Sequence, residues 1–171
     1  MNTTNDFVIN TNTVGMSFNA FEKDGLWGVK NEETGEIICE PEFDSIDKFY
    51  SGFAVICKKG RRGFINSEGK KVFQKYCDVR RFVNGLAAVK LFFDRWTFID
   101  VAGNELTKQT YKEVGDFNTF SYAAVCEEDK KCGFINRAGI EILDGCVFDE
   151  TEVRSNGTLV GKIEGVEFVI S

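Results

Sequence analysis

Carboxylates are the most concentrated side chains in the sequence that could do chemistry. They gather in three short stretches, at 40–44, 127–129 and 149–152. A pair of carboxylic acids can hydrolyse a glycosidic bond when one of them is desolvated, and closely spaced acidic residues bind calcium when they follow the spacing of a calcium loop. No stretch has that spacing, and nothing marks one carboxylate as desolvated. We therefore interpret all three stretches as solvated loop segments.

The sequence contains no histidine, and this absence removes several reaction classes. Ser-His-Asp and Cys-His nucleophile systems, zinc sites with histidine ligands and haem with a proximal histidine all require that residue. The glycines form neither a G-x-x-x-x-G-K-S/T nor a G-x-G-x-x-G pattern, so no phosphate-binding loop is predicted. We expect a protein that is not an enzyme and has no cofactor or metal site.

Cysteines are the remaining candidates for metal or redox chemistry. The six are Cys39, Cys57, Cys77, Cys126, Cys132 and Cys146. Their spacing includes no C-x-x-C pair, which a zinc knuckle or a thioredoxin motif would need. The N-terminus shows no basic segment followed by an apolar one, and no apolar stretch is long enough to span a membrane. The sequence therefore predicts six reduced thiols, none of them a metal ligand, in a cytoplasmic protein that does not contact a membrane.

Basic side chains gather between positions 58 and 90, although the whole chain carries a net charge of −6. This segment holds ten basic and two acidic residues, and the segments on both sides are net acidic. The candidate partner-binding residues are Arg61, Arg62, Lys70, Lys71, Arg80 and Arg81. The cluster either attracts the neighbouring acidic segments of the same chain or docks an acidic surface of another protein or peptide. Nucleic acid is not expected, because the acidic flanks would repel phosphates.

An internal repeat organises nearly the whole chain. Four segments share a glycine or threonine position, at Gly28, Gly63, Thr97 and Gly133, in steps of 34 to 36 residues. A second glycine follows in each, and then an aromatic residue at Phe43, Tyr76, Tyr111 and Phe148. A further aromatic follows in three of them, at Phe49, Phe82 and Phe117. We expect a cap or tail at 1–16 and a single repeat domain over 17–171, with repeats at 23–57, 58–90, 91–126 and 127–162 and a partial repeat at 163–171.

These residues resemble the bacterial WG-repeat family. Its unit reads roughly G-x-W-G, then an aromatic residue, isoleucine and Asn or Asp, and ends in a G-L-A-x-V segment. The name-giving pair is intact as Trp27-Gly28, and the later repeats have Arg62-Gly63, Trp96-Thr97 and Cys132-Gly133 at these structural positions. The resemblance implies a non-enzymatic repeat domain that mediates interactions.

Each repeat is expected to form a three-strand meander. In the second repeat the strands are predicted at 53–58, 61–66 and 70–73, with a tight turn at Lys59-Gly60. Segment 43–52 is predicted to cross over irregularly and to place its aromatics between adjacent repeats. The glycine position should leave room for a neighbouring backbone or ring, and Trp27 and Trp96 should pack in the core, with ligand stacking as the alternative.

No window shows sustained helical periodicity, so the fold class is all-β. We expect about four to five antiparallel meanders stacked into a curved sheet or solenoid, with a closed barrel- or propeller-like arrangement as the alternative. The predicted function is a non-enzymatic module for protein–protein interaction. The alternative is a carbohydrate or cell-envelope binding module that uses exposed aromatic faces, and burial of the Trp and Tyr side chains would count against it.

Overall fold

The computed structural model describes residues 7–9, 18–143 and 145–170. Within these residues the chain is all-β, as the sequence predicts, and its one helical element is the 3-10 turn η1 (Phe92–Asp94). No helix in the described part is long and apolar enough to cross a membrane. The strands form five small antiparallel sheets of three or four strands each. Of the predicted cap or tail at 1–16, only residues 7–9 are described.

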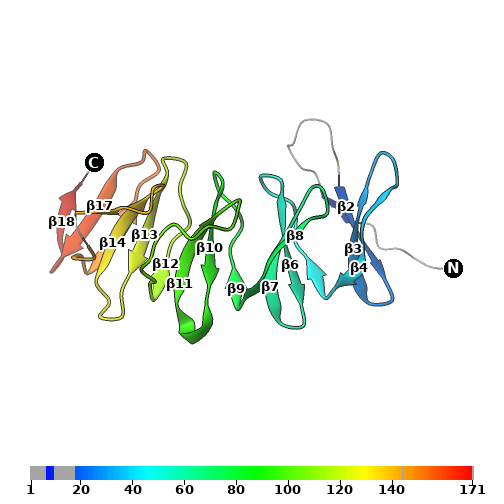
Figure 1. Cartoon of the computed structure of the whole chain (residues 1–171). Coiled ribbons are helices and arrows are strands. Elements are labelled where there is room, and N and C mark those ends of the chain that lie inside the picture. Colours follow the sequence, from blue (N-terminus) through cyan, green and yellow to red (C-terminus); the bar gives the residue numbers. More distant parts are fainter. Residues whose placement is uncertain (1–6, 10–17, 144, 171) are drawn as a thin grey trace. The chain divides into compact units, whose positions relative to one another are not determined.

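The chain packs into two compact units, Met1–Arg81 and Phe82–Ser171, here called the N-terminal unit and the C-terminal unit. The strands of the N-terminal unit are β1 (Phe7–Ile9), β2 (Phe18–Lys23), β3 (Leu26–Asn31), β4 (Ile37–Phe43), β5 (Ser45–Ile46), β6 (Phe53–Lys58), β7 (Arg61–Asn66), β8 (Lys71–Tyr76) and β9 (Asp78–Val79). They include two four-stranded sheets in chain order, β1 to β4 and β5 to β8 (Figure 1).

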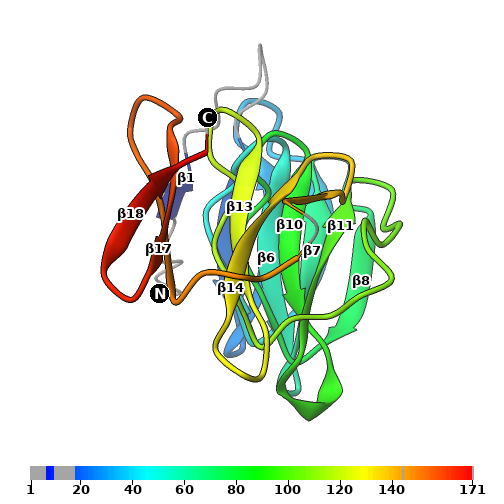
Figure 2. The same cartoon turned by 90° about the vertical axis from the view of Figure 1, so that its left-hand side faces the viewer.

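The C-terminal unit continues the same pattern of hairpins. Its strands are β10 (Leu86–Lys90), β11 (Trp96–Asp100), β12 (Glu113–Val114), β13 (Tyr122–Cys126), β14 (Cys132–Asn136), β15 (Glu141–Ile142), β16 (Glu150–Val153), β17 (Leu159–Ile163) and β18 (Val166–Val169). β10 pairs with β11, β12 to β15 form a four-stranded sheet, and β16 to β18 form a three-stranded one. Figure 2 shows β18, in red, as the outermost strand of this last sheet.

The predicted meander of the second repeat is confirmed. β6 and β7 occupy the predicted residues, and β8 begins one residue later than predicted and runs to Tyr76. The crossover segment contains the short strand β5 and an isolated bridge between Tyr50 and Phe53, without a helical turn.

An asparagine or aspartate at the end of strands β3, β7, β11 and β14 closes the turn that follows each of them. Asn66 Oδ1 accepts hydrogen bonds from the backbone N–H groups of Glu68 (3.1 Å) and Lys70 (2.8 Å). Equivalent bonds are accepted by Asn31, Asp100 and Asn136. Such a side chain replaces a backbone partner that the turn lacks, which explains the Asn or Asp of the repeat pattern.

Aromatic side chains fill the core, as the repeat predicts. Phe43, Phe49, Tyr76, Phe82, Tyr111, Phe117 and Phe148 all have exposed fractions of 4% or less. In the N-terminal unit, Phe49 joins buried residues of β2 to β4 and of β6 and β7 in one cluster. In the C-terminal unit, Phe117 lies among buried residues of β10, β11, β13 and β14. The cores therefore lie between successive sheets within each unit.

Candidate functional site: the basic cluster and the hairpin ends

The six basic residues of the predicted partner site lie around strand β7. Arg61 and Arg62 begin β7, Lys70 and Lys71 follow its other end, and Arg80 and Arg81 follow β9. Because a strand rises about 3.3 Å per residue, the first two pairs are separated by most of the length of β7. Arg61, Arg62, Lys70, Lys71 and Arg81 are exposed, and Arg80 is half-buried.

Lys71 is engaged in an ion pair that joins the two sheets of the N-terminal unit. Its ammonium group binds Glu42 of β4, which also receives Lys58 of β6. Hydrogen bonds from the two lysines lower the pKa of Glu42 to about 2, and the bond to Glu42 raises the pKa of Lys71. Lys71 therefore acts as an internal tie between sheets, which is the first of the two interpretations of the cluster.

Two arginines of the cluster make looser contacts. Arg62 Nε lies 3.5 Å from Asp78 Oδ1, with both side chains close to half exposed. The Arg81 guanidinium lies 5.0 Å from the centre of the Tyr50 ring. An exposed ion pair contributes little to stability, so Arg62 can exchange its contact with Asp78 for one with a partner.

The position that Trp27 occupies in the first repeat forms a cross-strand pair near the turn of five hairpins in the described residues, here called the Trp-position pair. The five pairs are Glu22 with Trp27, Cys57 with Arg62, Lys90 with Trp96, Cys126 with Cys132, and Lys162 with Glu167. Trp96 is 9% exposed and belongs to the core of its unit, and Trp27 is half-buried against the core of its own. The predicted core packing is confirmed for Trp96, whereas Trp27 packs against its core and remains partly exposed.

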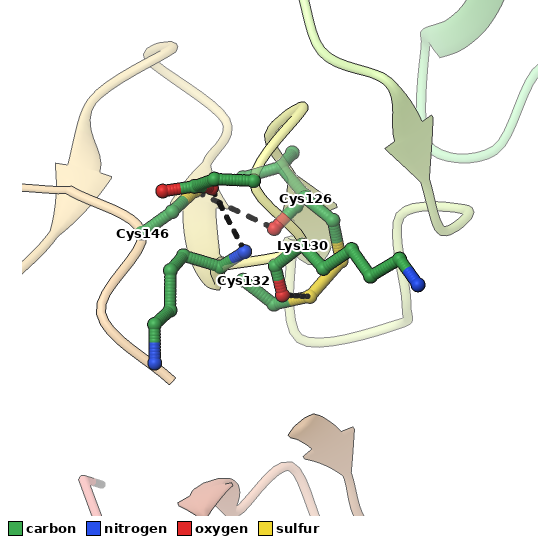
Figure 3. Close-up of a disulfide and its surroundings, with 7 residues drawn as sticks. Cys126, Lys130, Cys132 and Cys146 are labelled. Atoms are coloured by element: carbon green, nitrogen blue, oxygen red, sulfur yellow. Dashed lines mark hydrogen bonds between the residues drawn. A yellow bond between two sulfur atoms is a disulfide. The ribbon is translucent and has the colours of Figure 1, made fainter. Parts of the chain in front are cut away.

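The Trp-position pair of the β13–β14 hairpin is a disulfide, so the prediction of six reduced thiols is wrong. Cys126 and Cys132 are bonded, with their Cα atoms 4.0 Å apart (Figure 3). The Cys132 N–H donates to Phe148 (2.7 Å) and the Cys126 carbonyl accepts from Lys112 (2.9 Å), both outside the hairpin. Side chains of such a non-hydrogen-bonded pair approach closely. The gaps between cysteines could not reveal this pairing, but aligning Cys132 with Trp27 and reading the hairpin register would have.

The other cysteines are free. Cys39 is buried, Cys57 and Cys146 are half-buried, and Cys77 is exposed. Burial is the main cause that raises the pKa of Cys146 to about 12. No group of three or more Cys, Asp or Glu side chains in the described part of the chain has the arrangement of a metal site.

The glycine after the Trp position admits a neighbouring backbone, as predicted. A Cβ atom on Gly28 would lie 2.6 Å from the Cys39 carbonyl oxygen, and one on Gly133 would lie 2.7 Å from that of Gly145. Gly63 is buried at the same position. Thr97 replaces the glycine in the third repeat and is fully buried, with its hydroxyl 3.4 Å from that of Thr107.

Two aspartates of the acidic stretches hold hairpin turns in place, although the sequence analysis interpreted these stretches as solvated loop segments. Asp44 Oδ2 accepts a hydrogen bond from the Lys59 N–H (2.6 Å), and Asp149 Oδ2 accepts one from the Glu164 N–H (2.8 Å). Each of these aspartates follows the repeat aromatic and reaches the turn of the next hairpin. The recurring aromatic-Asp dipeptide was the available signal for this role.

These features define an all-β repeat protein built from hairpins of one recurring register. A family model described as "WG containing repeat" matches residues 27–61, 63–91 and 96–130, more than half of the chain. The chain therefore belongs to the WG-containing repeat family. A search of curated proteins finds no match.

Several solved structures are similar to the chain. Hsv2p of Kluyveromyces lactis matches with a TM-score of 0.45 and 10% identity, over 84% of this chain and 52% of that one. BamB from Moraxella catarrhalis matches with a TM-score of 0.41 and 13% identity, over 90% and 55%. The WD40 β-propeller domain of Doa1 matches with a TM-score of 0.39 and 13% identity, over 92% and 60%. The chain thus spans little more than half of these proteins.

Proposed function

We propose that the chain is a non-enzymatic binding module whose second repeat binds an acidic surface of another protein or peptide. The observation that supports this proposal most is Arg62, an exposed guanidinium at a position where two other repeats place a tryptophan that packs in or against the core. The repeat geometry does not require a cation there. Arginine suits carboxylate recognition because its planar fork matches the two oxygens.

The proposed surface is narrower than the six residues that the sequence singled out. Lys71 is bound to Glu42 and serves the fold. Arg61, Arg62 and Lys70 are exposed at the two ends of β7, so an extended acidic segment that spans the strand would meet both ends. Electrostatic steering by such a surface speeds association and weakens as salt is added.

Aromatic burial counts against the carbohydrate alternative. Trp96, Tyr76 and Tyr111 have exposed fractions of 9% or less. Tyr50 is 45% exposed, but Arg81 lies over its ring. These contacts weigh against the Trp and Tyr stacking on which the alternative depends, so we do not propose this function.

Fluorescence anisotropy with a labelled oligoglutamate peptide tests the proposal, and an oligoglutamine peptide of equal length is the control ligand. The wild-type chain should bind oligoglutamate, and the affinity should fall as salt rises. The variant Arg61→Glu/Lys70→Glu should bind at least about tenfold more weakly while keeping the wild-type melting temperature.

Two matched variants separate the possible outcomes. Lys108→Glu reverses an exposed lysine of the C-terminal unit and should leave binding nearly unchanged. Lys71→Gln should lower the melting temperature more than it weakens binding. If the double reversal unfolds the chain, the cluster is an internal tie, and if the reversal leaves binding unchanged, the acidic-partner proposal fails.

A further inference from the structure

A shallow pocket of about 280 Å³, wide open to solvent, lies at the end of the β13–β14 hairpin opposite to the disulfide. Its lining residues are Phe120, Ser121, Tyr122, Asn136, Arg137 and Ala138. They belong to the loop that leads into β13 and its first residue, and to the last residue of β14 and the turn that follows it; β13 and β14 are the two yellow strands of Figure 2. Two paired strands therefore position both walls of the pocket.

The loop before β13 is one residue longer than the loops before β6 and β10, and it has the same length as the loop before β17, where Arg154 bonds to Thr158. Tyr50 and Phe53 exchange two backbone hydrogen bonds across a two-residue turn, as do Val83 and Leu86. Before β13 the bonded residues are instead Asn118 and Tyr122. Here the Tyr122 N–H donates to the side-chain oxygen of Asn118 (2.9 Å) instead of its backbone carbonyl.

The longer loop presents an aromatic ring at a fixed place. Phe120 is 49% exposed, and a Cβ atom on Gly157 would lie 2.6 Å from its ring. The Gly157 backbone therefore supports the ring from one side. Ser121 beside it has a φ of 71°, a costly conformation for a residue with a side chain. Tyr122 packs against the buried cluster of Phe134 and its neighbours.

Arg137 supplies the cationic wall and has no carboxylate partner within the described residues. Its Nη2 donates to the backbone carbonyl of Asn84 at 2.7 Å, which fixes one edge of the guanidinium. The other arginines of the C-terminal unit, Arg95 and Arg154, are paired with glutamates. The equivalent turn positions in the first three repeats hold Glu32, Ser67 and Val101, so the repeat does not require an arginine here.

We propose that this pocket binds a carboxylate that carries an apolar group. The guanidinium of Arg137 donates to the carboxylate, a charge-assisted and directional interaction. The Phe120 ring and the Tyr122 ring cover the apolar group beside it. A ligand cation is repelled by Arg137. The site lies in a different repeat from the basic cluster and does not depend on the function proposed above.

Nuclear magnetic resonance of the full chain tests the site with three small probes. N-acetylphenylalanine carries a terminal carboxylate, N-acetyl-glutamyl-phenylalanine amide carries a side-chain carboxylate, and N-acetylphenylalanine amide carries neither. At millimolar concentration, the two carboxylates should shift the amide signals of Phe120, Ser121, Tyr122 and Arg137, and the neutral amide should not. The tighter of the two carboxylates identifies the kind of carboxylate that the site takes.

Two substitutions decide whether Arg137 is the anchor. Arg137→Gln should weaken carboxylate binding by at least about tenfold, while Lys130→Gln, at the opposite end of the same hairpin, should bind like wild type. Phe120→Ser should weaken binding without altering the signals of the disulfide end. The proposal is overturned if no probe shifts these signals, if the neutral amide shifts them as strongly, or if Arg137→Gln binds unchanged. Oligoglutamate binding at the basic cluster remains a separate readout in every variant.

Discussion

The β10–β11 and β13–β14 hairpins of the C-terminal unit fill equivalent repeat positions in opposite ways. The first pairs Lys90 with Trp96, the ammonium 5.6 Å from the ring centre, and continues with the buried Thr97. The second pairs Cys126 with Cys132 and continues with Gly133. The same hairpin register therefore accommodates either a non-covalent cation–ring contact or a disulfide at the Trp-position pair. The residue that follows the pair must fit the space that the neighbouring strand or segment leaves for it.

Replacing Gly133 with threonine, the residue of the other hairpin, should destabilise the protein more than any other change that we consider. The Cβ atom would lie 2.7 Å from the Gly145 carbonyl oxygen and 3.2 Å from Cys146 Cα, and backbone atoms cannot yield as a flexible side chain can. We expect Gly133→Thr to lower the free energy of unfolding by about 3 kcal/mol or more. Urea unfolding measures this.

The reverse change in the first hairpin is the matched control. Thr97→Gly removes a buried side chain and its hydroxyl contact with Thr107 but creates no clash. Its cost should be about 1–2 kcal/mol. If Gly133→Thr costs no more than Thr97→Gly, the close backbone approach at Gly133 does not explain the glycine.

Reduction of the disulfide should have the next largest effect. Opening a loop of this length gives the unfolded chain more freedom and should destabilise the protein by about 2 kcal/mol. Urea unfolding with and without dithiothreitol measures the loss, and Cys126→Ser/Cys132→Ser should not respond to the reductant. Denatured wild-type protein without reductant should show four free thiols, and a count of six would contradict the disulfide.

The variant Lys90→Met tests how much the non-covalent Lys90–Trp96 pair contributes to stability. It removes the cation beside Trp96 and the ion pair with Asp94 while retaining a long apolar stem. We expect a loss of about 0.5–1 kcal/mol, smaller than the loss on reducing the disulfide. Equal losses would mean that the two Trp-position pairs hold their hairpins equally well.

The smallest expected effect is a dependence on pH near the turn of the β10–β11 hairpin. Hydrogen bonds from Lys90 and Lys112 lower the pKa of Asp94 to about 2 from its ordinary value of 3.8. The stability that the ionised Asp94 contributes through these two lysines is therefore fully present above pH 3.8 and is lost as the pH falls towards 2. In Asp94→Asn, the melting temperature should fall slightly less than in the wild type as the pH is lowered from about 4 to 2. An identical pH dependence in the two proteins would show that the ion pairs of Asp94 do not stabilise the fold.

The sequence alone determined the repeat, the all-β class, the strands of the second repeat and the buried aromatics. Each of these depends on local spacing: Lys59-Gly60 requires a turn, and the strands on either side alternate in a fixed register. The need for space at the glycine position was also readable, because the same residue type recurred at Gly28, Gly63 and Gly133.

Only the tertiary structure decided which charges meet. Glu42 and Lys71 are 29 residues apart and belong to different sheets, so no local pattern predicted that Lys71 is a tie. The Arg137 pocket likewise depended on Asn84, 53 residues away, whose backbone carbonyl holds the guanidinium. Contacts between side chains of different sheets and loops depend on distances in space. A repeat pattern predicts where the backbone positions lie, but it does not predict which contacts are made by residues that differ between repeats.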